Sequence, residues 1–320
     1  MMPGADSDLP LRVRCGQSTV SVKPATAVVM VWFLIAIMAG FTVLNAMQLP
    51  RLGTRYELPY PPSSLVGFFL AIFCVTCALL LLLVHHAFRD ESSLEFFQRI
   101  KAKLTVVALI STLANAALGI ASSGGFLHFP MFPAYMLFMT VMTTLGATTR
   151  ESAWFARRLP CWMLVGFHGF RLPVEIFLHS GVASGIVPPQ LTWSWPLGNG
   201  QNVDVYVALL ALVLGAWAWF NQQAGRPDLP TAVLWGFGVL GLAALANILR
   251  LAVLSMPGSP LLRFPEHMIA PLLGPPFILL PLILVQFAIG GQLLILRRAW
   301  DSGSAGASSA VKRTESASML

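Results

Sequence analysis

The sequence predicts an all-α fold: a polytopic transmembrane helix bundle of about eight spans with both termini in the cytoplasm. Of the 320 residues, 56% are hydrophobic and only 10% are charged, with a mean hydropathy of +0.74. A soluble domain of this size needs far more charged surface. The basic residues also concentrate in alternate loops between apolar runs. We therefore interpret the net charge of +7 as a signal of membrane orientation and expect no binding of nucleic acid.

Apolar runs of membrane-spanning length alternate with polar loops along the chain. Residues 1–23 form a predicted cytoplasmic tail, residues 24–298 the helix bundle, and the Ser-, Ala- and Gly-rich residues 299–320 a disordered cytoplasmic tail. The predicted spans cover residues 26–47, 64–86, 104–121, 131–148, 162–179, 204–220, 232–255 and 270–296.

The distribution of Lys and Arg predicts the orientation of these spans. With the N-terminus inside, fifteen of the twenty basic residues fall in cytoplasmic regions and only Arg51, Arg55 and Arg263 in outer loops. Arg171 and Arg250 lie within spans. Because cytoplasmic loops carry the excess of basic residues, this asymmetry favours an even number of spans and both termini inside.

The fifth predicted span carries charges in an otherwise apolar segment. His168, Arg171, Glu175 and His179 recur at spacings of three and four residues, which places them on one helix face. An ionised side chain at the bilayer centre costs roughly 2.5–3.5 kcal/mol on insertion scales. Such residues persist when they are paired, turned into the bundle or exposed to a water-filled cavity.

Two interpretations of this charged face stay open from the residues alone. Arg171 and Glu175, at i and i+4, could form a structural ion pair along a helix that Pro173 bends. Alternatively, they could line a polar pocket for an anionic group. Buried ion pairs are a poor route to stability, which keeps the second interpretation in view.

Further polar residues are predicted at the outer side of the same bundle. Asn202 and Asp204 open the sixth span, where they could simply cap the helix. Asn247 and Arg250 share a face in the outer half of the seventh, from which Arg250 could snorkel to the surface. His267 follows in the next outer loop. The predicted ligand-binding residues are Arg171, Glu175, His179, Asn202, Asp204, Asn247 and Arg250.

The loop between the fifth and sixth spans carries no charge. It contains three prolines, and Trp193 and Trp195 suit the membrane–water interface. We expect a structured interfacial or re-entrant lid here.

Motifs for metals, cofactors and nucleophilic catalysis are missing from the sequence. There is no HExxH, P-loop, dinucleotide-binding fingerprint or nucleophile elbow. Cys74 and Cys77 form a CxxC inside an apolar run, where thiols are usually inert. We expect neither a metal nor a cofactor.

The run FRLPVEIFLHSGVASGIVPPQLTW, followed by GNGQNVDVYVALLAL, resembles an uncharacterised family of bacterial multi-pass membrane proteins with F-R-x-P-V-E and G-x-N-F-D motifs. Residues 160–300 are similar to this family. The residues that fall on the motifs are Arg171, Pro173, Glu175, Asn202 and Asp204, whereas Val203 stands where the family has Phe. The resemblance implies a cell inner membrane protein and supplies no reaction.

Three functions follow as hypotheses. The first is binding or transport of a small anionic molecule or lipid headgroup through an outward-facing polar pocket. The second is a membrane-embedded enzyme at the outer leaflet, with His179 or Glu175 as the acid–base group. The third is a structural subunit whose polar face binds a partner helix. The lipid bilayer is the partner common to all three.

Overall fold

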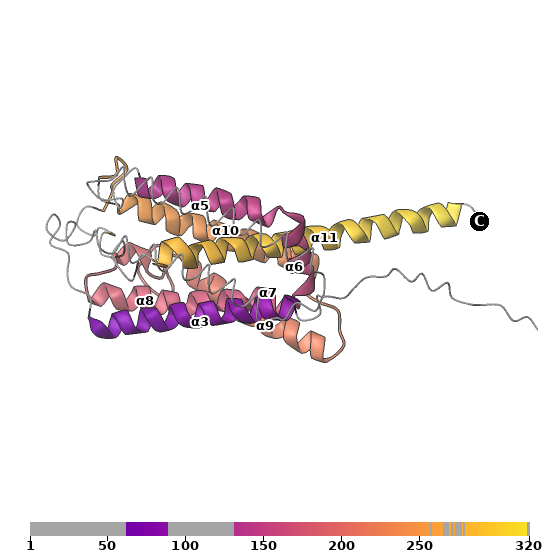
Figure 1. Ribbon diagram of the computed structural model, residues 1–320, viewed down its shortest axis with the longest axis horizontal. Coiled ribbons are helices and arrows are strands. Elements are labelled where there is room, and N and C mark those ends of the chain that lie inside the picture. The colour runs from indigo at the N-terminus through magenta and orange to yellow at the C-terminus, as the bar shows by residue number, and fades with distance from the viewer. Residues whose placement is uncertain are drawn as a thin grey trace, which may run out of the picture.

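The computed structural model describes residues 62–88, 131–256, 258–264, 269, 272, 277 and 279–318, with the backbone alone for 303–318. The predicted spans 26–47 and 104–121 lie outside these residues, so the number of eight spans stays a prediction. The regular structure of the described part is helical. Successive helices run back and forth between two ends of a bundle (Figure 1). We call these ends the Cys161 end and the Ala183 end, after the first and last residues of one crossing.

Five crossings in the described residues are long and apolar enough to span a membrane. They correspond to the second, fifth, sixth, seventh and eighth predicted spans. The helix of the fourth, α5 (Met131–Ala147), is shorter. The crossings are α3 (Ser63–Phe88), α7–η1–α8 (Cys161–Ala183), α9 (Asp204–Gln223), α10 (Thr231–Leu254) and η4–α11 (Leu280–Ser302).

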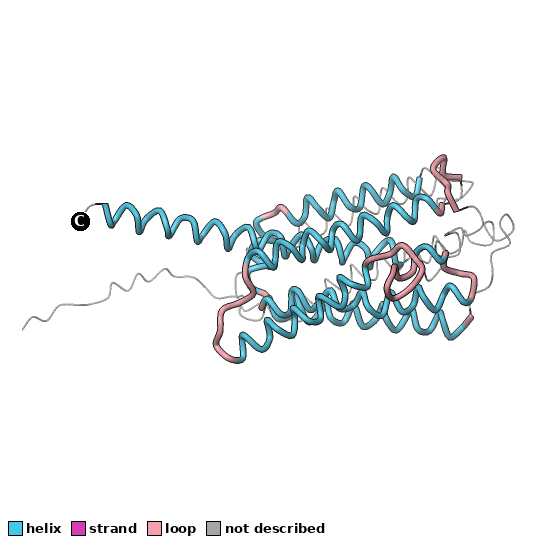
Figure 2. Tube along the Cα trace, turned by 180° about the vertical axis from the view of Figure 1, so that it is seen from behind, coloured by secondary structure: helices cyan, strands magenta, loops and turns pink. Residues whose placement is uncertain are grey.

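The helices form two layers (Figures 1 and 2). Helices α5, α10 and α11 (Val285–Ser318) pack together in one layer, and α3, α8 (Arg171–Ala183) and α9 in the other. Helix α9 also contacts α10 across the layers, and the short amphipathic helix α6 (Arg150–Arg158) packs against α11. The space between α8 on one side and α10 and α11 on the other holds the polar residues described below.

The fifth predicted span is a single crossing with an interruption at its centre. Helix α7 (Cys161–Gly166) passes into a 3₁₀ turn, η1 (Phe167–Phe170), before α8 begins at Arg171. Pro173 provides the reason, because a proline lacks the N–H and its ring clashes with the carbonyl four residues earlier, here Gly169. In a 3₁₀ turn, side chains three residues apart eclipse one another, so His168 and Arg171 emerge on the same side.

Close contact between glycines fixes α9 beside this crossing. A Cβ added to Gly215 would lie 2.9 Å from the Cα atom of Gly166, so the α7 and α9 backbones meet without intervening side chains. Small residues of this kind allow the close helix packing found in membranes. The crossing brings the first turn of α9 alongside α8, and this places Asp204 opposite Arg171.

Helix α11 continues past the bundle to Ser318 (Figure 1). It therefore includes residues 299–318, for which the sequence composition predicts a disordered tail. Ala, Ser, Lys, Arg and Glu dominate the last part of this segment, and it contains no proline. Nothing in the run forces the backbone out of the helical conformation.

The predicted ordering of the loop between α8 and α9 is confirmed. It contains a 3₁₀ turn, η2 (Pro189–Leu191), and an isolated β-bridge between Trp193 and Asn202. The Gln190 side chain donates to Ser255 Oγ at 2.7 Å, which anchors the loop to the end of α10. This bond holds the loop against α10 at the Ala183 end.

Candidate functional site

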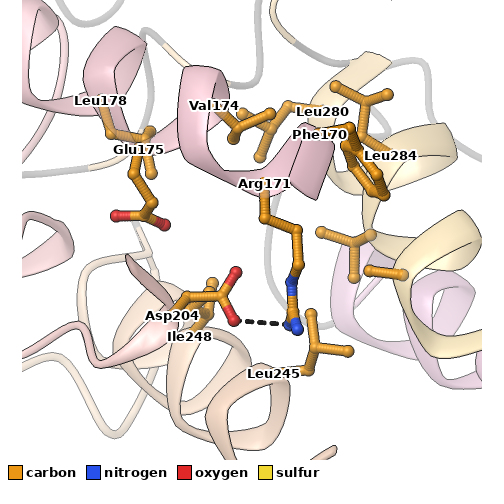
Figure 3. Close-up of a pocket in the computed structure, with 12 residues that line it drawn as sticks. Phe170, Arg171, Val174, Glu175, Leu178, Asp204, Leu245, Ile248, Leu280 and Leu284 are labelled. Atoms are coloured by element: carbon orange, nitrogen blue, oxygen red, sulfur yellow. Dashed lines mark ion pairs between the residues drawn. The ribbon is translucent and has the colours of Figure 1, made fainter. Parts of the chain in front are cut away.

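A buried ion pair between α8 and α9 forms the centre of the site. Arg171 Nη2 lies 2.5 Å from Asp204 Oδ1, and the two side chains are 2% and 6% exposed. The same nitrogen donates to the Gly241 carbonyl of α10 at 3.4 Å. One guanidinium thus connects three helices from both layers. Figure 3 shows its ion pair with Asp204.

The suggested ion pair of Arg171 with Glu175 along their own helix is corrected by this geometry. Arg171 pairs with Asp204, and Glu175 Oε1 instead accepts a hydrogen bond from Asn202 Nδ2 at 2.7 Å. Both residues of α8 point into the space between the layers, where polar groups from α9 and the preceding loop are within reach (Figure 3). Burial of a charged side chain requires a fixed partner, and here that partner comes from another element.

Asn202 is fully buried and connects the loop to both helices. Its amide nitrogen donates to Glu175 Oε1 and, at 3.1 Å, to the Leu191 carbonyl. Its Oδ1 accepts from the Asp204 backbone N–H at 2.9 Å. This Asx turn starts α9, so Asn202 takes over the role expected of an N-terminal cap. The Asp204 carboxylate is left free for Arg171, in a first helical turn where the helix dipole favours a negative charge.

The polar cluster borders a small cavity. Arg171, Glu175 and Asp204 line it, together with apolar residues of α8, α10, η4 (Leu280–Leu284) and α11. Its volume of about 30 Å³ has room for about two waters or one small head group. The space between the lining atoms, including the part open to the outside, is about 370 Å³.

Besides Asp204 Oδ1, which forms the ion pair with Arg171, three polar atoms of this cluster have no hydrogen-bond partner within the described part of the chain. They are Nε and Nη1 of Arg171 and Oε2 of Glu175. Leaving a buried donor or acceptor unpaired costs about 1–3 kcal/mol, and more for a charged group. The arrangement therefore offers two N–H-bearing nitrogens and one carboxyl oxygen to a further group in the cavity.

The remaining predicted site residues are not among those that line the cavity. His179 is exposed and stacks on Trp193, with ring centroids 4.6 Å apart. Asn247 Nδ2 donates to the Gln201 carbonyl at 2.8 Å, and Arg250 Nη2 donates to Asn247 Oδ1 at 2.9 Å. These residues hold the loop in place. His267 lies outside the described residues.

On the Cys161 side of the ion pair, sequence analysis placed His168 on the charged face but missed its buried partner Gln292. His168 is fully buried, with Nδ1 3.4 Å from Nε2 of Gln292, a buried residue of α11. A Cβ on Gly241 would overlap the Gln292 amide, so this glycine leaves room for it. The sequence signal for this contact was Gln292 in an apolar run, and an uncharged polar residue indicates a buried site less strongly than a charged one does.

No group of three or more His, Cys, Asp or Glu in the described part of the chain is arranged to hold a metal ion. The chain matches no protein-family model, no curated protein and no solved structure in these comparisons. The resemblance to the family with the F-R-x-P-V-E motif therefore stays a prediction. The long apolar helices define the class: the chain is a multi-pass integral membrane protein.

Replacing Asn202 tests whether the loop, α8 and α9 depend on one side chain. Asn202→Ala leaves Glu175 Oε1 and the Leu191 carbonyl without their donor, and we expect a loss of about 1–3 kcal/mol in unfolding free energy. Unfolding of the purified protein in mild detergent, titrated with denaturing detergent, measures this loss. Gln201→Ala is the control, because the exposed Gln201 side chain makes none of these bonds. Equal effects of the two substitutions would contradict the role given to Asn202.

Proposed function

We propose that the protein binds a small anionic molecule or the anionic headgroup of a lipid at Arg171, or moves it across the membrane. The observation that carries this proposal is which nitrogens of the Arg171 guanidinium have hydrogen-bond partners. Asp204 and Gly241 hold Nη2, while Nε and Nη1 are buried beside the cavity without partners. Each of these nitrogens can donate a charge-assisted hydrogen bond to a carboxylate or phosphate oxygen.

Charge balance gives Glu175 a second role in this proposal. With Glu175 and Asp204 both ionised, the cluster carries one more negative than positive charge. A monovalent anion that enters together with one proton leaves this net charge unchanged, whereas an anion alone adds a charge in a region of low dielectric. Glu175 Oε2, which has no partner in the described part, is the atom in position to take that proton and donate it to the anion.

We also propose that the protein lies in the cell inner membrane with the Ala183 end facing outward. Support comes from the described basic residues on the bundle surface. Arg150, Arg157, Arg158, Arg226, Arg297 and Arg298 lie toward the Cys161 end, and among the described residues Arg250 and Arg263 lie toward the Ala183 end. This is the asymmetry of a protein whose Cys161 end is cytoplasmic.

A structural role is the second candidate, because one observation favours it. The Glu175–Asn202 bond and the Trp193 Nε1 bond to the Glu175 carbonyl, at 3.2 Å, attach the loop to α8 without any ligand. An enzymatic role would rest on Glu175 alone, since His179 stacks on Trp193 away from the cavity lining. Direct binding measurements distinguish the first proposal from both.

Arg171→Gln should abolish anion binding. We expect acetate or inorganic phosphate to stabilise the protein in phosphatidylcholine nanodiscs, by about 2.7 kcal/mol at one hundred times Kd. If a lipid headgroup is the ligand, phosphatidylglycerol in the nanodisc should stabilise it instead. Arg250→Gln is the matched control, because this exposed arginine does not line the cavity. The proposal fails if none of the three anions stabilises the wild type, or if both variants lose the effect equally.

Anion binding should strengthen as the pH falls. The bound state holds one proton more than the free state, so affinity should rise by up to tenfold per pH unit lowered. The charged groups facing Glu175 are Arg171 of its own helix and Asp204 of α9, and His168 lies one turn beyond Arg171. The lining residues of α10 and α11 are apolar. Glu175→Gln should bind the anion with a flat pH dependence. If anion affinity in this variant depends on pH as steeply as in the wild type, Glu175 is not the group that takes up the proton.

A further inference from the structure

We infer that the ligand of this cavity is an amphiphilic anion, with a carboxylate or phosphate head on an apolar chain. The inference rests on the proposed function, in which Arg171 binds the anionic head. It goes further by assigning the class of molecule from the part of the cavity that Arg171 does not form. A free fatty anion and a membrane lipid share this chemistry.

The rim of the cavity is apolar, whereas its base is polar. Val174 of α8, Ile248 of α10 and Leu280 of η4 are the described lining residues that are half-buried, and all three are apolar. Arg171, Glu175 and Asp204 are buried beneath them. A fully hydrated anion would lose its water at this rim without compensation. A molecule with an apolar chain would gain contacts there.

The wall opposite Arg171 has no hydrogen-bonding side chain among the described residues. It consists of Leu245 from α10 with Leu284, Val285 and Ala288 from η4 and α11. Figure 3 labels Leu245 and Leu284. A sugar phosphate or another polyhydroxylated anion would leave its hydroxyl groups unpaired against this wall, at a cost that disfavours such ligands. Alkyl groups need no hydrogen-bond partner and can pack against this wall.

The cavity is small and open. Its volume of about 30 Å³ has room for a small head group at Arg171, and the cavity continues to the outside. A chain attached to the head would therefore pass the half-buried apolar residues Val174, Ile248 and Leu280. The head would accept a hydrogen bond from Nε or Nη1 of Arg171, and the first methylene groups would lie against the apolar rim.

A chain-length series tests the inference. Kd for acetate, butyrate and hexanoate is measured in phosphatidylcholine nanodiscs from the shift in unfolding midpoint, with butanol and hexanol as uncharged controls. We expect Kd to fall about fourfold for each added methylene until the mouth is filled, the factor that corresponds to burial of one CH₂. The alcohols should bind far more weakly, and Arg171→Gln should bring each carboxylate to the level of its alcohol.

Filling the apolar wall tests the contribution of the chain to binding separately from that of the head. Ala288→Leu adds volume opposite Arg171 and should remove most of the preference for hexanoate over acetate while acetate still binds. Ala243→Leu, at an exposed position of α10, is the control and should keep the preference. If Ala288→Leu does not fold, Leu284→Ala enlarges the same wall and should move the chain-length optimum upward.

The outcomes distinguish this inference from the proposed function. Equal Kd values for acetate and hexanoate would overturn the amphiphilic ligand and leave anion binding at Arg171 standing. A chain-length preference that survives Ala288→Leu and Leu284→Ala unchanged would also overturn it. If no carboxylate binds more tightly than its alcohol, anion binding itself fails, and this inference fails with it.

Discussion

The ion pair between Arg171 and Asp204 is the interaction on which the rest of the site depends. A guanidinium buried among apolar helices requires a fixed negative partner, and the close α7–α9 crossing at Gly166 and Gly215 supplies it. With Asp204 engaged, the start of α9 relies on Asn202, which in turn attaches the loop to Glu175. The position of the loop thus follows from the pairing of two charges between helices.

The same arrangement divides the cavity into two chemical regions. At its base, a guanidinium held by one nitrogen keeps two others available, and a carboxyl group stands beside them. At its rim, the side chains are apolar. Preorganised donors beneath an apolar entrance favour ligands that combine one charge with hydrocarbon. The charged group then binds the polar side chains, and the hydrocarbon contacts the apolar ones.

Much of this architecture was predictable from apolar run lengths, since a bilayer requires helices of a set length. Arg171, Glu175 and Asp204 stood out because charges in such runs are costly. The partner of Arg171 was not predictable, because spacing along one helix does not show what approaches from another. For the same reason, sequence placed Arg250 in the site, whereas its guanidinium bonds Asn247 of α10, which in turn donates to the loop carbonyl of Gln201.

A double-mutant cycle on Arg171 and Asp204 tests the central claim most directly. Arg171→Met and Asp204→Leu, alone and together, are compared by unfolding free energy in mild detergent. Each single change leaves one buried charge unpaired and should cost about 3–5 kcal/mol, whereas the double variant should cost far less than their sum. Additive losses would show that the two side chains act independently, and would contradict an ion pair that organises the site.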